Sequence, residues 1–206
     1  MFNTLNILER IMLDPPTAKI YSRLGFKKNS TSLSASQRQE TDRHIQEAVS
    51  LIDLQGSFLI LPIRKNDGQK VELHPDLSFV SEKLGRFLGH CREAALMGAT
   101  AGPSIMEAIR EKTKQDKMTA VVVYDATASE MADAALDWIM DYINRQLLRE
   151  GKHLLPRRFS AGYGDLALSS QIEIHKKLQL ERIGVRLTGR CLLVPEKSVT
   201  AISGIL

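Results

Sequence analysis

The stretch Arg158-Phe-Ser-Ala-Gly-Tyr-Gly-Asp165 interrupts the regular patterning of the last quarter of the chain. Its two glycines, Gly162 and Gly164, let the backbone turn tightly and approach another group closely. Arg158 can offer a planar fork of N–H donors to a carboxylate, and Tyr163 can offer an aromatic face. This set suits a ligand that carries a carboxylate and a flat ring. An irregular surface connection with Arg158 in an ion pair explains the same residues equally well on chemistry alone.

Regular elements are predicted on both sides of this stretch. Downstream we expect a helix, two strand-like runs and a small, β-branched segment, at residues 168–180, 184–189, 192–196 and 198–205. Upstream, residues 119–150 have a helical pattern with a possible break at 127–129, and Gly151 is expected to end that helix.

The first 56 residues are predicted to be mainly helical. The expected elements are a helix over 5–12 that stops at Asp14-Pro-Pro16, a short helix over 18–24, a surface connector at 27–36, and a helix from Ser36 to Gly56. We treat residues 1–35 as an N-terminal helical extension.

The residue pattern changes from helical to strand-like after Gly56. A strand is predicted for Ser57-Phe-Leu-Ile-Leu-Pro-Ile-Arg64, and a hairpin turn for Asn66-Asp-Gly68. The remaining expected elements are a returning strand at 69–74, a helix at 80–88, a buried strand at 93–99 and a helix over 104–114 capped by Ser104. There is no internal repeat and no long linker. The pattern therefore predicts one α+β domain over residues 1–206.

The composition is that of an ordinary soluble protein, with 206 residues, 43% hydrophobic and 25% charged. No apolar run approaches the ~20 residues that cross a bilayer, and the first residues lack the pattern of a signal peptide. Cys91 and Cys191 are the only cysteines. We therefore expect a cytoplasmic protein with reduced thiols and no membrane association. The net charge of +4 permits an anionic ligand or partner.

Most catalytic and metal chemistries lack a signature in this sequence. The loop Gly98-Ala-Thr-Ala-Gly-Pro-Ser104 has no Walker A lysine, and a tight turn between a strand and a helix is favoured over an anion cradle. The five histidines are scattered, and no serine lies in a G-x-S-x-G elbow. With 5% aromatic residues, stacking on nucleic acid is not expected. We predict no catalytic residue, no metal site and no nucleic-acid partner.

Three segments resemble the activation (reactivation) domain of cobalamin-dependent methionine synthase, which binds S-adenosylmethionine. The R-x-x-x-G-Y pattern from Arg158 to Tyr163 is the core motif of that family. Residues 183–188 and 193–201 resemble its G-x-x-L-T … P … S-V-S stretch, and residues 128–139 resemble its L-A-E-A helix. The match is specific over residues 129–204. The earlier residues look most like the stand-alone forms of this domain that accompany split methionine synthases.

The resemblance implies a twisted, mainly antiparallel sheet with flanking helices, and it implies a set of ligand contacts. Arg158 would hold the methionine carboxylate, and Asp133 would pair with the amino group. Ser160, Gly162 and Tyr163 would contact S-adenosylmethionine through backbone and ring. The sequence departs from the family pattern in three places. Gly164 replaces a common proline, and Leu187-Thr-Gly-Arg190 replaces the L-T-E-S tetrad. A second acidic ligand for the amino group, expected just before the arginine, has no counterpart, since Glu150 or Lys152 lies there.

The resemblance also implies a function, namely reductive reactivation of a methionine synthase that lacks its own activation domain. The cobalamin would be carried by that partner, and a flavodoxin-like or other small electron donor would supply the electron. The isolated chain would then show no turnover. Two alternatives stay open: activation of another corrinoid methyltransferase, and a ligand-free interaction subunit with the same fold.

Overall fold

The computed structural model describes residues 4–27 and 32–206. Within these ranges the strands are β1 (Asn6–Leu8), β2 (Gln55–Asn66), β3 (Lys70–Leu73), β4 (Leu77–Val80), β5 (Glu93–Thr100), β6 (Arg186–Leu187), β7 (Leu193–Val194) and β8 (Ser198–Ile205). The helices of the same ranges are α1 (Thr17–Arg23), α2 (Ala35–Leu51), α3 (Glu82–Phe87), α4 (Ser104–Lys114), α5 (Met118–Leu147) and α6 (Ser170–Leu178), with 3-10 turns η1 (Leu148–Glu150) and η2 (Leu180–Ile183). Part of the connector predicted at 27–36 lies outside the described residues.

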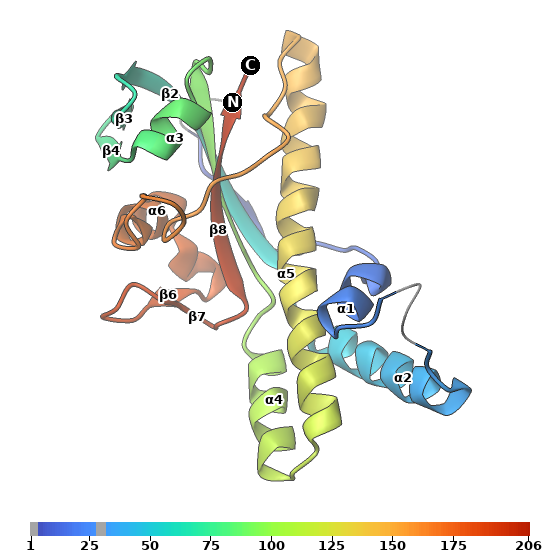
Figure 1. The fold of residues 1–206 in the computed structure, drawn as a ribbon. Helices are drawn as coiled ribbons and strands as arrows, with labels where there is room; N and C mark the ends of the chain where they lie inside the picture. Colours follow the sequence, from blue (N-terminus) through green and yellow to red (C-terminus); the bar gives the residue numbers. More distant parts are fainter. Residues whose placement is uncertain (1–3, 28–31) are drawn as a thin grey trace.

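An antiparallel sheet built around β2 and β5 forms the centre of the molecule (Figure 1). β5 pairs with β2 from Gln55↔Thr100 to Pro62↔Glu93, and β8 pairs with the other edge of β5. The second edge of β2 is divided, because β1 pairs with its beginning and β3 with its end, and β4 continues from β3. β6 and β7 form a separate two-stranded ribbon. The predicted α+β class with a mainly antiparallel sheet is confirmed.

Helices cover both faces of this sheet (Figure 1). On one face Phe58 and Met97 pack with buried side chains of α2, α4 and α5. On the other face Leu59 and Leu96 pack with those of α3 and α6. Each fully buried side chain of this size contributes roughly 1.5–3 kcal/mol. Because both faces are covered, β2 has a continuous apolar run instead of the alternation typical of a half-exposed strand.

The long helix α5 is continuous where a break was considered possible. The hydroxyl of Thr127 donates a hydrogen bond of 2.7 Å to the carbonyl of Val123, one turn earlier, and is fully buried. That bond satisfies a polar group which would otherwise favour a break. Gly151 ends the helical region, as predicted, with a left-handed φ of 68°.

The predicted helix over residues 5–12 is wrong, because residues 6–8 form β1 and pair with β2. Leu5 and Ile7 pack against one face of the sheet, whereas Leu8 packs against the other. This alternation has the period of a strand, and the edge of β2 supplies backbone partners that a local pattern cannot reveal. The second predicted short helix, over residues 18–24, is present as α1.

Several boundaries also differ from expectation. α2 ends at Leu51, and Gly56 lies inside β2 instead of ending the helix. β4 was not predicted, and Ser104 is the first residue of α4 and makes no side-chain cap. The hairpin is confirmed: Gly68 has a φ of +87°, and the carboxylate of Asp67 accepts hydrogen bonds from two backbone N–H groups of the turn.

Candidate functional site

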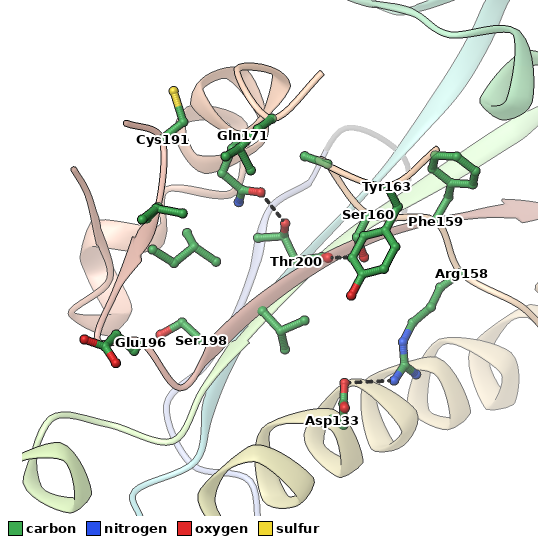
Figure 2. Close-up of a pocket in the computed structure, with 15 residues that line it drawn as sticks. Asp133, Arg158, Phe159, Ser160, Tyr163, Gln171, Cys191, Glu196, Ser198 and Thr200 are labelled. Atoms are coloured by element: carbon green, nitrogen blue, oxygen red, sulfur yellow. Dashed lines mark hydrogen bonds and ion pairs between the residues drawn. The ribbon is translucent and has the colours of Figure 1, made fainter. Parts of the chain in front are cut away.

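The backbone of the Arg158 segment is fixed by β8. Phe159 and Ile202 exchange two backbone hydrogen bonds, of 2.8 and 2.7 Å, and the hydroxyl of Ser160 donates to the carbonyl of Thr200 at 2.8 Å. The Phe159 side chain packs into the core on the α3–α6 side of the sheet. Arg158, its neighbour in an extended segment, extends the other way toward α5 (Figure 2).

The two glycines of the segment shape the turn that presents Tyr163. Gly162 and Gly164 have φ values of +84° and +62°, which favour glycine. The Gly162 N–H donates to the carbonyl of Leu166 at 2.9 Å, and a Cβ atom at Gly162 would lie 3.2 Å from the Leu168 side chain. Tyr163 is 72% exposed. Gly162 therefore supports the turn without lining the cavity described below.

Asp165 closes the segment and anchors it to α3. Its carboxylate accepts hydrogen bonds from the Ser81 hydroxyl at 2.5 Å and from the Glu82 N–H at 2.8 Å. The Ser81 hydroxyl and the backbone N–H groups at the start of α3 hold the pKa of Asp165 below its usual range. The residue has a structural partner and does not face the cavity.

A cavity of about 690 Å³ lies between the Arg158 segment, α6, the β6–β7 ribbon and β8 (Figure 2). Its volume is within the range of small-molecule sites. The lining residues are Asp133, Arg158, Phe159, Ser160, Ala161, Tyr163, Leu168, Gln171, Cys191, Leu192, Leu193, Glu196, Ser198, Val199 and Thr200. Arg158 and Asp133 lie at the α5 end, whereas Glu196, Gln171 and Cys191 lie toward the opposite end (Figure 2).

The α5 end of the cavity contains an ion-pair network. The Arg158 guanidinium contacts the carboxylates of Asp133, at 3.3 Å, and Asp137. Two cations of α1 approach the same carboxylates: Lys19 lies 3.1 Å from Asp137, and Arg23 lies 3.9 Å from Asp133. Partial burial alone would raise the pKa of Asp137, but hydrogen bonds from Arg158 and Lys19 outweigh it and lower that pKa. The Asp137 carboxylate therefore stays ionised at neutral pH.

The structure brings four of the five predicted ligand residues to one cavity. Arg158, Ser160, Tyr163 and Asp133 line it, and Gly162 supports it from behind. Arg158 is also ion-paired, as the alternative reading expected, but its partners include Asp133 of the same cavity.

Sequence reasoning missed the polar residues of the opposite end. Gln171 is 3% exposed, and its carbonyl oxygen accepts a hydrogen bond from the Thr200 hydroxyl at 3.0 Å. Its amide nitrogen has no hydrogen-bond partner among the residues that the structure describes. Glu196 lies in the segment between β7 and β8 and lines the cavity. Gln171 belongs to no motif, and the packing of α6 against β8 brings it to Thr200. Glu196 lies within the resembling segment 193–201 but is not one of the residues that define its pattern.

Other observations bear on cofactors and location. In the part of the chain that the structure describes, no group of three or more His, Cys, Asp and Glu side chains could hold a metal ion. Both cysteines are free thiols. Among the described helices, none has the length and apolar character needed to span a bilayer.

The fold and the site define an α+β domain with a curled antiparallel sheet and a ligand-sized cavity that is charged at one end. A solved structure described as "Crystal Structure of the MetH Reactivation Domain bound to AdoHcy" has this fold. The two superpose with a TM-score of 0.71 over 98% of this chain and 78% of the other, with 12% sequence identity. The sequence matches no family model and no curated protein. The chain thus has the reactivation-domain fold, as the sequence resemblance implied.

Proposed function

We propose that this chain binds S-adenosylmethionine in the cavity and supports reductive reactivation of a cobalamin-dependent methionine synthase carried on a separate chain. The observation that carries the proposal is the pairing of Arg158 with Asp133 at the edge of a cavity of about 690 Å³. An amino-acid moiety carries one carboxylate and one ammonium group, so a cation and an anion side by side can pair with both. The likeness of the fold to a domain with bound AdoHcy supports the same ligand class.

In this proposal the ligand replaces the contact between Arg158 and Asp133, and each of the two side chains then pairs with one charged group of the ligand. A guanidinium has five N–H donors, of which Arg158 uses two on the aspartates, so it can also fork a carboxylate. Asp133 then takes the α-ammonium group. Because the amino-acid moiety is a zwitterion, its entry leaves the net charge of the network unchanged.

The remaining cavity residues suit the rest of such a ligand. Apolar walls at Leu168, Leu193 and Val199 would cover the methylene and nucleoside portions of the ligand, and the exposed ring of Tyr163 stands at the cavity mouth. The Ser160 hydroxyl is used to fix the backbone on β8, so we assign its ligand contact to the backbone.

The partner's cobalt supplies the methyl-accepting chemistry, so this chain needs only to bind and orient the sulfonium compound. The corrinoid partner is a methionine synthase without its own activation domain, and the electron comes from a small acidic donor such as a flavodoxin-like protein. The +4 charge of this chain favours such a donor. We assign the process to the cytoplasm.

Calorimetry of the purified chain with S-adenosylmethionine and S-adenosylhomocysteine tests the proposal first. We expect one site per chain for both compounds, and much weaker binding of methionine or adenosine alone. Addition of the chain to an inactivated corrinoid methionine synthase, with an electron donor, should then restore turnover only when S-adenosylmethionine is present. Absence of binding at millimolar ligand would contradict the proposal and favour a ligand-free interaction subunit.

A further inference from the structure

We infer that Asp137 is a positioning residue that holds Arg158 at the edge of the cavity, while Asp133 is the carboxylate that a ligand takes over. This inference rests on the proposed function, because it assigns separate tasks to the two aspartates around the arginine that would bind the ligand carboxylate. The sequence motif singles out Asp133 alone, and Asp137 enters only through the geometry of the network.

Two cations, Arg158 and Lys19, each contact one oxygen of the Asp137 carboxylate. Its Oδ1 atom accepts a hydrogen bond from Nη1 of Arg158, and its Oδ2 atom accepts one from Nζ of Lys19 at 3.1 Å. With one oxygen on each cation, the carboxylate is fixed in orientation, and it fixes the guanidinium in turn. Asp137 does not line the cavity. Its side chain is 46% exposed, but both of its oxygens are already paired, and a ligand in the cavity meets Asp133 instead.

Asp133 is held more loosely and faces the cavity. Its Oδ1 atom lies 3.3 Å from Nη2 of Arg158, and its other oxygen lies 3.9 Å from a guanidinium nitrogen of Arg23. Its side chain is 42% exposed, and it lines the cavity. Arg23 makes its close contact, at 2.5 Å, with Glu130 instead. An incoming ammonium group can therefore replace Arg158 on Asp133 without disturbing a tight contact.

The two aspartates lie four residues apart on α5, one helical turn, so a single guanidinium can reach both. If Asp137 loses its charge, Arg158 keeps one carboxylate partner, Asp133, and will pair with it fully. That shift moves the guanidinium from its place and occupies the ammonium site at the same time. The expected cost falls on the amino-acid moiety of a ligand and leaves its nucleoside portion unaffected.

The test measures coupling between Asp137 and the ligand carboxylate. Dissociation constants are measured for S-adenosylmethionine and for its decarboxylated analogue, which keeps the amine, with the wild type, Asp137→Asn and the control Asp141→Asn. Asp141 is exposed and lies one turn further along α5. We expect Asp137→Asn to weaken S-adenosylmethionine about 10-fold, the equivalent of one charge-assisted contact. Its advantage over the analogue should narrow by less than this, because the analogue's amine also competes with Arg158 for Asp133. Asp141→Asn should leave the ratio unchanged.

Lys19→Met is a second test that leaves Asp137 itself unchanged. Lys19 is exposed, and its replacement removes one of the two cations that contact the Asp137 carboxylate. Lys19→Met should also reduce the ratio of the two dissociation constants, analogue over S-adenosylmethionine, but by a smaller factor than Asp137→Asn. Melting temperatures show that each variant is folded. If the wild type prefers S-adenosylmethionine to the analogue, and Asp137→Asn and Lys19→Met show the wild-type ratio of dissociation constants, the positioning role of Asp137 is wrong and the proposed function stands. If the wild type binds neither compound, the proposed function fails and this inference fails with it.

Discussion

At the scale of single residues, Arg158 supplies the positive charge of the residues that line the cavity. Arg158 joins the backbone turn of its own segment to two carboxylates of α5, and its side chain is 24% exposed. A charge-assisted fork that is partly shielded from water contributes more than a surface ion pair, because water competes less well for the donors. The affinity for a carboxylate-bearing ligand should therefore depend on this side chain more than on any neighbouring cation.

We predict that Arg158→Ala weakens S-adenosylmethionine by roughly 10- to 100-fold, since charge-assisted hydrogen bonds contribute about 1.5–3 kcal/mol each. Arg158→Lys should recover only part of the loss, because an ammonium group cannot make the fork. Calorimetry gives the dissociation constants, and melting temperatures confirm that the variants fold. Arg157→Ala is the internal control, and it should change the affinity by well under tenfold. A larger effect at Arg157 than at Arg158 would show that the motif has been placed on the wrong residue.

At the scale of elements, α3 is locked against the hairpin by close backbone contact. A Cβ atom added at Gly85 would lie 2.6 Å from the carbonyl oxygen of Gly68, and the side-chain amide of Asn66 donates to the carbonyl of Gly85 at 2.8 Å. The start of the same helix is held by Asp165 of the ligand segment. The α3–hairpin unit is therefore one of the supports of the site.

Gly85→Ala should destabilise the protein, although alanine is the better helix former. The propensity gain is about 1 kcal/mol at most, whereas overpacking against rigid backbone costs about 1–3 kcal/mol. We expect a melting temperature lower by about 2–8 °C for a chain of this size. Gly189→Ala is a matched control, because a Cβ atom there meets nothing within 4 Å and the φ angle is ordinary. Equal melting temperatures for the two variants would contradict the packing argument.

The elements that the sequence predicts well are those whose signal is local. The hairpin at Asn66-Asp-Gly68 and the helix of residues 118–147 follow from turn chemistry and apolar spacing. Residues 5–12 fail because their apolar spacing fits a helix, while pairing with β2, fifty residues later, decides the outcome. The short strand β4 has no signal apart from its pairing with β3.

The residues of the site also fall into those with a local sequence signal and those that only packing brings together. Arg158, Ser160 and Tyr163 belong to one short motif, so a single stretch of sequence predicts that they lie together. Asp137 and Gln171 reach the network and the cavity only through the packing of α5 and α6 around β8. A single sequence contains no information on which of its many aspartates and glutamines will arrive there. The structure supplies that information.

At the scale of the whole molecule, contacts between helices contribute to the response of stability to pH. The carboxylate of Glu47 on α2 accepts a hydrogen bond of 2.8 Å from the Tyr124 hydroxyl on α5 and one of 3.2 Å from His44. These bonds lower the pKa of Glu47, with Tyr124 the larger cause. Burial and the same carboxylate raise the pKa of Tyr124 to about 12. One contact between two helices therefore affects both the acid and the alkaline range.

The lowered pKa of Glu47 and the raised pKa of Tyr124 change the stability with pH in opposite directions. A carboxylate with a lowered pKa stabilises the folded state above its unfolded pKa of about 4.3, and this contribution is lost as the pH falls below that value. A tyrosine with a raised pKa stabilises the folded state below its unfolded pKa of about 10, and this contribution is lost as the pH rises toward 12. The lowered pKa of Asp137 and the Tyr21 pKa, raised to about 12, act in the same directions.

We therefore predict a plateau of melting temperature between about pH 5 and pH 10, with a decline on each side. Tyr124→Phe should make both declines shallower, because it removes the alkaline titration and returns the pKa of Glu47 toward its usual value. The plateau of this variant should also lie lower, since the hydroxyl donates a partly buried hydrogen bond to a charged group. Tyr163→Phe, at an exposed position, is the matched control and should follow the wild-type profile. Thermal unfolding in steps from pH 3 to pH 11 measures all three proteins. An unchanged profile in Tyr124→Phe would show that the contact between α2 and α5 does not govern the pH response.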